Sequence, residues 1–237
     1  MNVNIVKDKA AIAKMAYDIM LDMINSKDEV TLGLATGSSP EGIYELFRKN
    51  KPNVSHVTTV NLDEYIGLDA EHDQSYAYFM NKHLFHHLNF KQTFLPNGMN
   101  SDFAGECAHY DEILEENTPD LQLLGIGNNG HIAFNEPGMS FELTTNVAEL
   151  APATVEANSR YFASHDDVPK TAFSMGIKSI MQAKEILLIA SGVGKAEAIK
   201  GMLEGPVTNQ MPASILQQHP KVTVIIDEDA ASLLSKK

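Results

Sequence analysis

Residues 125–138, GIGNNGHIAFNEPG, gather the side chains best suited to moving a proton. His131 stands between the amide of Asn129 and the carboxylate of Glu136. An imidazole titrates near neutral pH, and a hydrogen-bonding neighbour decides which of its nitrogens carries the proton. A single histidine in a polar loop would mean little, but this concentration of Gly, Asn, His, Glu and Pro indicates an oriented general acid and base.

The first six residues of this segment also match the glycine pattern of dinucleotide-binding loops, G-x-G-x-x-G. That pattern requires a helix to open at its third glycine, whereas this chain soon runs into a Pro-Gly turn. We therefore expect that this loop does not bind a dinucleotide. The glycines are interpreted as a sharp bend that lets Asn129, His131 and Glu136 face one cavity.

Asp63 is a second candidate for proton transfer. It directly follows the apolar run VTTVNL and precedes Glu64. An acidic residue in that place can simply cap a turn or a helix. It can also serve as the carbon base of an aldose–ketose isomerisation, where it carries a proton between neighbouring carbons of an enediol.

Two further loops could bind a phosphate. In residues 36–40, TGSSP, the expected helix takes Ser39 as its N-cap and Pro40 as its first residue. This loop is either a well-capped turn or a cradle of amides and hydroxyls for an anion. Lys195, in SGVGK, opens another helix, where the macrodipole disfavours a cation unless an anion is near. It is either a solvated lysine or a phosphate ligand, and neither loop has the Walker A spacing.

The cluster HLFHH places His83 and His87 one turn apart on an expected helix. The zinc-protease pattern requires a glutamate where Leu84 stands, and the sequence offers no third ligand. We predict no metal site.

The candidate residues need a scaffold that brings distant loops together. Short apolar runs rich in β-branched side chains alternate with stretches that carry apolar residues at helical spacing. The predicted strands are 30–35, 57–62, 121–126, 185–190 and 222–226. The predicted helices are 10–25, 41–49, 76–87, 104–116 and 196–203. This alternation predicts a single-domain α/β fold over residues 1–237, with a doubly wound, mostly parallel, Rossmann-like sheet and helices on both faces.

In such a sheet, ligands bind outside the carboxyl ends of the strands. The four loops considered above each follow a predicted strand, so we expect them to meet at one edge and form an active site. The least regular region, about 135–169, is expected to be a lid or an excursion near that site.

The composition limits the partners. Lys and Arg number 18 against 31 Asp and Glu, giving a formal net charge of −13, which disfavours binding to a nucleic-acid backbone. A single cysteine, Cys107, excludes an internal disulfide framework and fits a reduced, cytoplasmic setting. The N-terminal residues lack a signal-peptide pattern, and no apolar run approaches membrane-spanning length, so we expect neither export nor membrane insertion.

Taken together, these motifs resemble the glucosamine-6-phosphate deaminase family along essentially the whole chain. The segments LGLATGSSPEGIY, VNLDEYIGL, LLGIGNNGHIAFNEPG, ANSRYF, SGVGKAEAI and SILQQHP occur in the family's order. The resemblance implies a hydrolase of amino-sugar catabolism and N-acetylglucosamine utilisation. It would convert glucosamine 6-phosphate to fructose 6-phosphate and ammonia without a cofactor.

The resemblance also implies roles for individual residues. It makes Asp63 the base that enolises the substrate, and His131, with Asn129 and Glu136, the group that opens the pyranose ring. The implied phosphate clamp consists of Gly37, Ser38, Ser39, Arg160 and Lys195, with Thr36 beside it. The resemblance also implies a lid near Arg160.

Two positions depart from the family pattern. Many relatives carry Asp where this chain has Asn129. An Asn carbonyl still orients an imidazole but brings no charge, so we hypothesise that Asn129 orients His131 without carrying a proton. Allosteric relatives are hexamers with basic residues soon after the NEP turn, whereas MSFELTTNVAELAP contains no Lys or Arg. We therefore expect a non-allosteric monomer.

Two other functions stay open. A 6-phosphogluconolactonase, which is a hydrolase of related fold, has a similar Gly-His loop, although the NEPG ending after GHIAF favours the deaminase. A non-catalytic sugar-phosphate sensor would normally bring a DNA-binding segment, and it would have little need for both Asp63 and His131.

Overall fold

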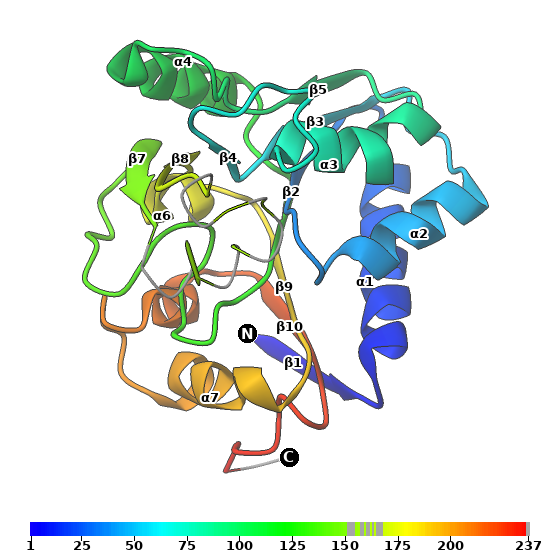
Figure 1. Ribbon diagram of the computed structural model, residues 1–237. Helices are drawn as coiled ribbons and strands as arrows, with labels where there is room; N and C mark the ends of the chain where they lie inside the picture. Colours follow the sequence, from blue (N-terminus) through cyan, green and yellow to red (C-terminus); the bar gives the residue numbers. More distant parts are fainter. Residues whose placement is uncertain (151–154, 157–158, 160–161, 163, 165–167, 236–237) are drawn as a thin grey trace.

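The fold is described from a computed structural model, which covers residues 1–150, 155–156, 159, 162, 164 and 168–235. At its centre is a seven-stranded sheet whose neighbouring strands all pair in parallel (Figure 1). The strand order is β1-β10-β9-β6-β2-β3-β5. The bounds are Asn2–Val6 for β1, Val30–Leu34 for β2, Val57–Asn61 for β3, Gln92–Phe94 for β5, Leu121–Leu124 for β6, Ile186–Ala190 for β9 and Val222–Asp227 for β10.

The strand order reverses direction at the middle of this sheet. From β2 the chain moves outward to β3 and β5, and from β6 it moves outward the other way to β9 and β10. β2 and β6 are neighbours, so the carboxyl ends of these two strands flank the crevice where doubly wound folds bind ligands. The predicted doubly wound, mostly parallel sheet is confirmed.

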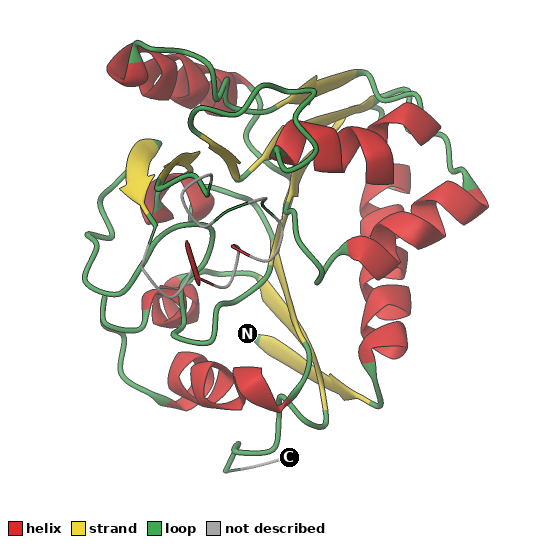
Figure 2. Ribbon diagram, in the orientation of Figure 1, coloured by secondary structure: helices red, strands yellow, loops and turns green. Residues whose placement is uncertain are grey.

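Helices cover both faces of the sheet (Figure 2). One hydrophobic cluster joins one face to α1, α2 and α3, and a second joins the other face to α4, α6, α7 and η4. The bounds are Lys9–Asn25 for α1, Glu41–Asn50 for α2, Tyr76–His83 for α3, Phe103–Glu116 for α4, Ile177–Ile180 for α6, Ala196–Glu204 for α7 and Pro212–Gln218 for η4. Within the described ranges, no helix is both long and apolar enough to cross a membrane.

The predicted helix 76–87 is wrong in its last third. Leu84 leaves the helical region, with φ −144° and ψ −58°, so α3 ends at His83 and a separate 3-10 turn, η1, spans Phe85–His87. The ring of His83 stacks on Phe79 at a centroid distance of 4.3 Å. The two histidines therefore do not form the helical pair that the spacing suggested. Among the described residues, no group of three or more His, Cys, Asp or Glu is placed to hold a metal ion.

A second, three-stranded antiparallel sheet was not predicted. Its order is β4-β8-β7, with bounds Asp63–Tyr65, Thr171–Ser174 and Asn146–Glu149 in that order. β4 begins two residues after the end of β3, so this sheet starts where the central sheet has its carboxyl edge. The described part of the region expected to be irregular, about 135–169, includes a regular strand, β7.

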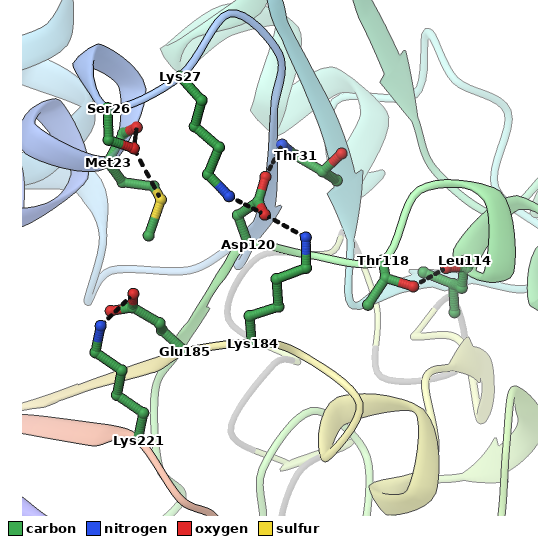
Figure 3. A network of polar contacts seen from close by, with 10 residues as sticks. All are labelled: Met23, Ser26, Lys27, Thr31, Leu114, Thr118, Asp120, Lys184, Glu185 and Lys221. Carbon is green, nitrogen blue, oxygen red and sulfur yellow. Dashed lines mark hydrogen bonds and ion pairs between the residues drawn. The ribbon is translucent and has the colours of Figure 1, made fainter.

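At the opposite, amino edge of the central sheet, the buried carboxylate of Asp120 links the segments at the starts of β2, β6 and β9 through hydrogen bonds (Figure 3). Asp120 Oδ1 accepts hydrogen bonds from Lys27 at 2.5 Å and Lys184 at 2.8 Å, and Oδ2 accepts one from the amide of Thr31 at 2.9 Å. Burial alone would raise the pKa of Asp120, but the two lysines and the amide outweigh it and hold the pKa below its ordinary value.

We expect Asp120→Ala to lower the free energy of unfolding by about 2 kcal/mol, because the amide of Thr31 would lose its buried acceptor. A carboxyl with a lowered pKa stabilises the folded state above its unfolded pKa, and this contribution is lost as the pH falls through the folded pKa. Urea unfolding should therefore show the two proteins converging in acid. The control is Lys14→Ala, which removes an exposed helical ion pair to Asp18 and should change little. Equal losses in the free energy of unfolding for the two variants would show that the hydrogen bonds of Asp120 do not stabilise the fold more than an exposed ion pair does.

Candidate active site

The loop after β6 turns back on itself so that His131 packs against Gly127. The amide of Gly127 donates to the carbonyl of His131 at 2.8 Å, and the amide of Gly130 donates to the carbonyl of Gly127 at 3.0 Å. Gly130 has φ +86°, a left-handed conformation that glycine adopts without strain. A Cβ atom on Gly127 would lie 2.3 Å from the imidazole, so this position leaves room only for glycine.

Within this loop, the three side chains singled out in the sequence are hydrogen-bonded to one another. Asn129 Oδ1 lies 2.7 Å from His131 Nδ1 and also accepts the backbone amide of His131 at 3.2 Å. Asn129 Nδ2 donates to Glu136 Oε2 at 2.7 Å. The asparagine therefore bridges the imidazole and the carboxylate.

The direction of this bridge decides the proton on the imidazole. The ionised carboxylate of Glu136 only accepts, so it faces the amino group of Asn129 and turns the carbonyl toward His131. Nδ1 of His131 must then carry a proton, which leaves Nε2 free to act as the base. Glu136 Oε1 also lies 3.4 Å from His131 Nδ1. Asn129 carries no charge, so the negative charge that would stabilise an imidazolium comes from Glu136.

Asp63 lies in β4, at the start of the second sheet. Its side chain is buried, with 7% of the residue exposed, and it accepts no hydrogen bond from any residue in the described ranges. Burial, and after it the charge of Glu64, raises the pKa of Asp63 to about 8. A carboxyl with a raised pKa and no hydrogen-bond donors is suited to taking up a proton from a carbon acid.

Ser174 of β8 connects the Asp63 strand to the His131 loop. Asp63 pairs with Ser174 across the antiparallel sheet, and Ser174 Oγ accepts the amide of Phe134 at 3.1 Å. Asn135 Nδ2 donates to the carbonyl of Met175 at 2.8 Å. The two candidate proton-transfer groups therefore lie on segments that are hydrogen-bonded to the same strand.

The loop after β2 comes close to the loop after β6. A Cβ on Gly125 would lie 3.7 Å from Ser39 Oγ. The predicted capping is wrong, however: α2 begins at Glu41, Pro40 stands at the cap position, and no side chain caps the helix. Within the described ranges, the hydroxyls of Thr36, Ser38 and Ser39 make no hydrogen bond, and Gly37 has φ +88°. Because these hydroxyls do not cap the helix, they stay available to an anion.

Lys195 follows β9 through a 3-10 turn, η3, over Val193–Lys195, and stands at the N-cap position of α7. Burial lowers the pKa of Lys195, and no carboxylate in the described ranges pairs with it. A Cβ on Gly194 would lie 3.9 Å from the side-chain amide of Asn128, so the loops after β9 and β6 are neighbours. An anion between them would remove the cost of this half-buried cation.

Asp227, which was not predicted from the sequence, fixes the loop before Lys195. Both of its carboxylate oxygens accept the amide of Gly192 at 3.0 Å, and Oδ1 also accepts the amide of Ala230 at 2.8 Å. Asp227 is the last residue of β10. It could have been found by the same reasoning that selected Asp63, namely an acidic residue at the carboxyl end of a strand. Arg160, the remaining predicted phosphate ligand, lies outside the described residues.

Comparison with known proteins decides among the relatives of this fold. Residues 7–225 match the family model of glucosamine-6-phosphate isomerases/6-phosphogluconolactonase. The chain belongs to this family. Within the family, it is 52% identical over 236 residues to a glucosamine-6-phosphate deaminase of Bacillus cereus (strain G9842), covering 100% of this chain and 90% of the relative.

Solved structures of the family place the chain nearer to one branch. A monomeric glucosamine-6-phosphate deaminase aligns with a TM-score of 0.94 and 44% identity, covering 98% of this chain and 100% of the other. The 6-phosphogluconolactonase of Trypanosoma brucei aligns with a TM-score of 0.84 but only 16% identity, covering 99% and 98%. This second likeness reflects the shared fold alone.

Proposed function

We propose that this chain is a glucosamine-6-phosphate deaminase, which converts glucosamine 6-phosphate and water to fructose 6-phosphate and ammonia. The observation that carries the proposal is the hydrogen-bonded set of His131, Asn129 and Glu136, joined through Ser174 to the strand of Asp63. The 52% identity to a deaminase over the whole chain supports the same substrate.

In the first stage, the pyranose ring opens. Nε2 of His131 takes the proton of the anomeric hydroxyl, and the resulting imidazolium returns a proton to the ring oxygen as that bond breaks. Asn129 holds the imidazole in the tautomer that leaves Nε2 free, and Glu136 stabilises the imidazolium. This assigns Asn129 an orienting role without proton transfer.

In the second stage, Asp63 removes the proton from C2 of the open-chain sugar and returns it to C1. The raised pKa of Asp63 makes its carboxylate a stronger base than an exposed aspartate. Removal of the C2 proton gives an enolamine, and return of the proton to C1 converts the enolamine to a ketimine. Water then adds to the ketimine carbon and the C–N bond breaks, which gives the ketose and ammonia and makes the overall reaction a hydrolysis.

The substrate phosphate is assigned to the loops after β2 and β9. Their candidate ligands are the amides and hydroxyls of residues 36–39 and the ammonium of Lys195, with Arg160 as a further ligand and a lid near it. Binding the remote phosphate holds C1 and C2 against Asp63 and His131, so that the reaction gains from orientation. The mechanism requires no metal ion and no organic cofactor.

The proposal extends to the state and setting of the enzyme. We assign residues 1–237 to a single domain and the protein to the cytoplasm, as a non-allosteric monomer that binds no nucleic acid. The monomeric deaminase at 44% identity supports the oligomeric state, and the absence of Lys and Arg from MSFELTTNVAELAP supports the lack of an effector site.

The purified protein, mixed with glucosamine 6-phosphate, should release ammonia and fructose 6-phosphate in equal amounts. The rate should follow a hyperbola in substrate concentration and stay unchanged when N-acetylglucosamine 6-phosphate is added. Sigmoidal kinetics abolished by that compound would contradict the non-allosteric monomer. If neither product forms but 6-phosphogluconolactone is hydrolysed, the protein is a lactonase instead.

A further inference from the structure

Glu64 is the neighbour of Asp63 in β4, and the proposed mechanism does not use it. It is 2% exposed. Its Oε1 accepts the amides of Tyr65 at 2.8 Å and Tyr76 at 2.9 Å, and its Oε2 accepts the amide of Ala77 at 2.8 Å. Tyr76 and Ala77 are the first residues of α3. The carboxylate of Glu64 therefore accepts hydrogen bonds from two backbone amides that have no partner within the helix.

Two adjacent buried carboxyl groups therefore differ in their hydrogen bonds. Glu64 accepts three N–H donors, whereas Asp63 accepts none from the described part of the chain. Amide donors at a helix N-terminus favour the ionised form of a carboxyl group. Where such a pair occurs, the two members commonly divide the roles of fixed charge and proton carrier.

We propose that Glu64 is a positioning residue for the deaminase reaction, whose negative charge, fixed against the N-terminus of α3, keeps the carboxylate of Asp63 a strong base toward C2 of the substrate. This inference rests on the proposed role of Asp63. It adds a residue that acts through the base without touching the substrate.

The directions of the two pKa shifts agree with this arrangement. Burial raises the pKa of Glu64 to about 7, although the amides of Tyr76, Ala77 and Tyr65 lower it. Burial and the charge of Glu64 raise the pKa of Asp63 to about 8. Both pKa values are therefore raised, and of the two carboxyl groups Glu64 is the one whose ionised form is favoured by backbone N–H donors.

Other groups around Asp63 do not account for this effect. From α3 and α4, the phenols of Tyr76 and Tyr110 interact with its charge, and burial raises the pKa of both well above the ordinary value, so both stay neutral near pH 8. On β8, the residues opposite Asp63 and Glu64 are Ser174 and Phe173, which carry no charge. Of these neighbours, only Glu64 changes its charge near neutral pH.

Removing the charge should weaken the base. A negative neighbour disfavours ionised Asp63, so Glu64→Gln lowers the pKa of Asp63. The acid limb of kcat/KM should then move to lower pH by about one unit. The plateau above that limb should fall about threefold, because a weaker base removes the C2 proton more slowly. Glutamine keeps an oxygen that can accept the amides of Tyr65 and Tyr76.

A matched control is available in Glu106, another buried carboxylate, which is 4% exposed. Its Oε1 accepts the amide of Asn97 at 2.7 Å and its Oε2 accepts Asn100 Nδ2 at 2.8 Å. Glu106→Gln removes a comparable buried charge with comparable hydrogen bonds, but Glu106 belongs to α4 and is not the chain neighbour of Asp63 in β4. We expect it to lower stability and to leave the acid limb of kcat/KM where it is in the natural protein.

The experiment measures kcat/KM for glucosamine 6-phosphate against pH in the natural protein, Glu64→Gln, Glu106→Gln and Asp63→Asn. An unmoved acid limb in Glu64→Gln, together with an inactive Asp63→Asn, overturns the inference about Glu64 alone. An active Asp63→Asn overturns the proposed base instead.

A second measurement covers the case in which Glu64→Gln does not fold. Carboxyl carbon resonances of the natural protein, followed against pH, should show Glu64 ionising before Asp63 and Asp63 ionising as activity rises. Ionisation in the reverse order overturns the inference.

Discussion

Asp63→Asn should bind glucosamine 6-phosphate and yet lose about 10³-fold in kcat, because general base catalysis contributes on this order and an amide cannot take up the C2 proton. Asparagine has nearly the same shape as aspartate, and the carboxyl group of Asp63 holds no hydrogen bond in the described structure that the change would break. KM should therefore change much less than kcat.

Two readouts separate this outcome from a folding defect. In deuterated water, the natural enzyme should exchange the C2 proton during turnover, and the variant should not. Loss of a buried group with a raised pKa should leave the urea midpoint unchanged or higher near neutral pH, because above the unfolded pKa Asp63 ionises more readily in the unfolded chain, which opposes folding. Near-normal turnover in Asp63→Asn would remove Asp63 from the mechanism.

Gly127→Ala should lower kcat/KM about 100-fold, because small displacements of a catalytic group commonly cost this much. The added Cβ would lie 2.3 Å from the imidazole, so the ring of His131 must move away from Asn129. Gly125→Ala is the matched control in the same loop, since its Cβ would meet nothing closer than Ser39 Oγ at 3.7 Å. Comparable losses in the two variants would show that the loop, and not the position of His131, limits activity.

The convergence of the candidate loops could be predicted, because it depends only on the alternation of strands and helices along the chain. Apolar strands separated by helices must lie parallel, so the loops after β2, β3, β6 and β9 share an edge. The helix ends were less predictable. Nothing in HLFHH shows that Leu84 leaves the helix, and the cap at α2 depends on hydrogen bonds that composition does not determine.

The environment of Asp63 could not be predicted, because it depends on contacts between distant segments. β4 and β8 have three and four residues, too few to show a periodic pattern, and they come from distant parts of the chain. The direction of the Asn129 amide likewise needs its contact with Glu136. Sequence therefore identified the chemical groups, whereas the burial that sets their proton affinities required the folded chain.

The reversal of strand order between β2 and β6 has a consequence for how activity arises during folding. Everything before residue 95 supplies the loop at residues 36–39 and Asp63, and everything after residue 120 supplies His131 and Lys195. The two parts meet where β2 pairs with β6, where β1 pairs with β10, and where β4 pairs with β8. Neither part holds a complete set of proposed catalytic and phosphate-binding groups, so ammonia release reports on the docking of the two parts. A chain in which only one of the two parts is folded would release no ammonia.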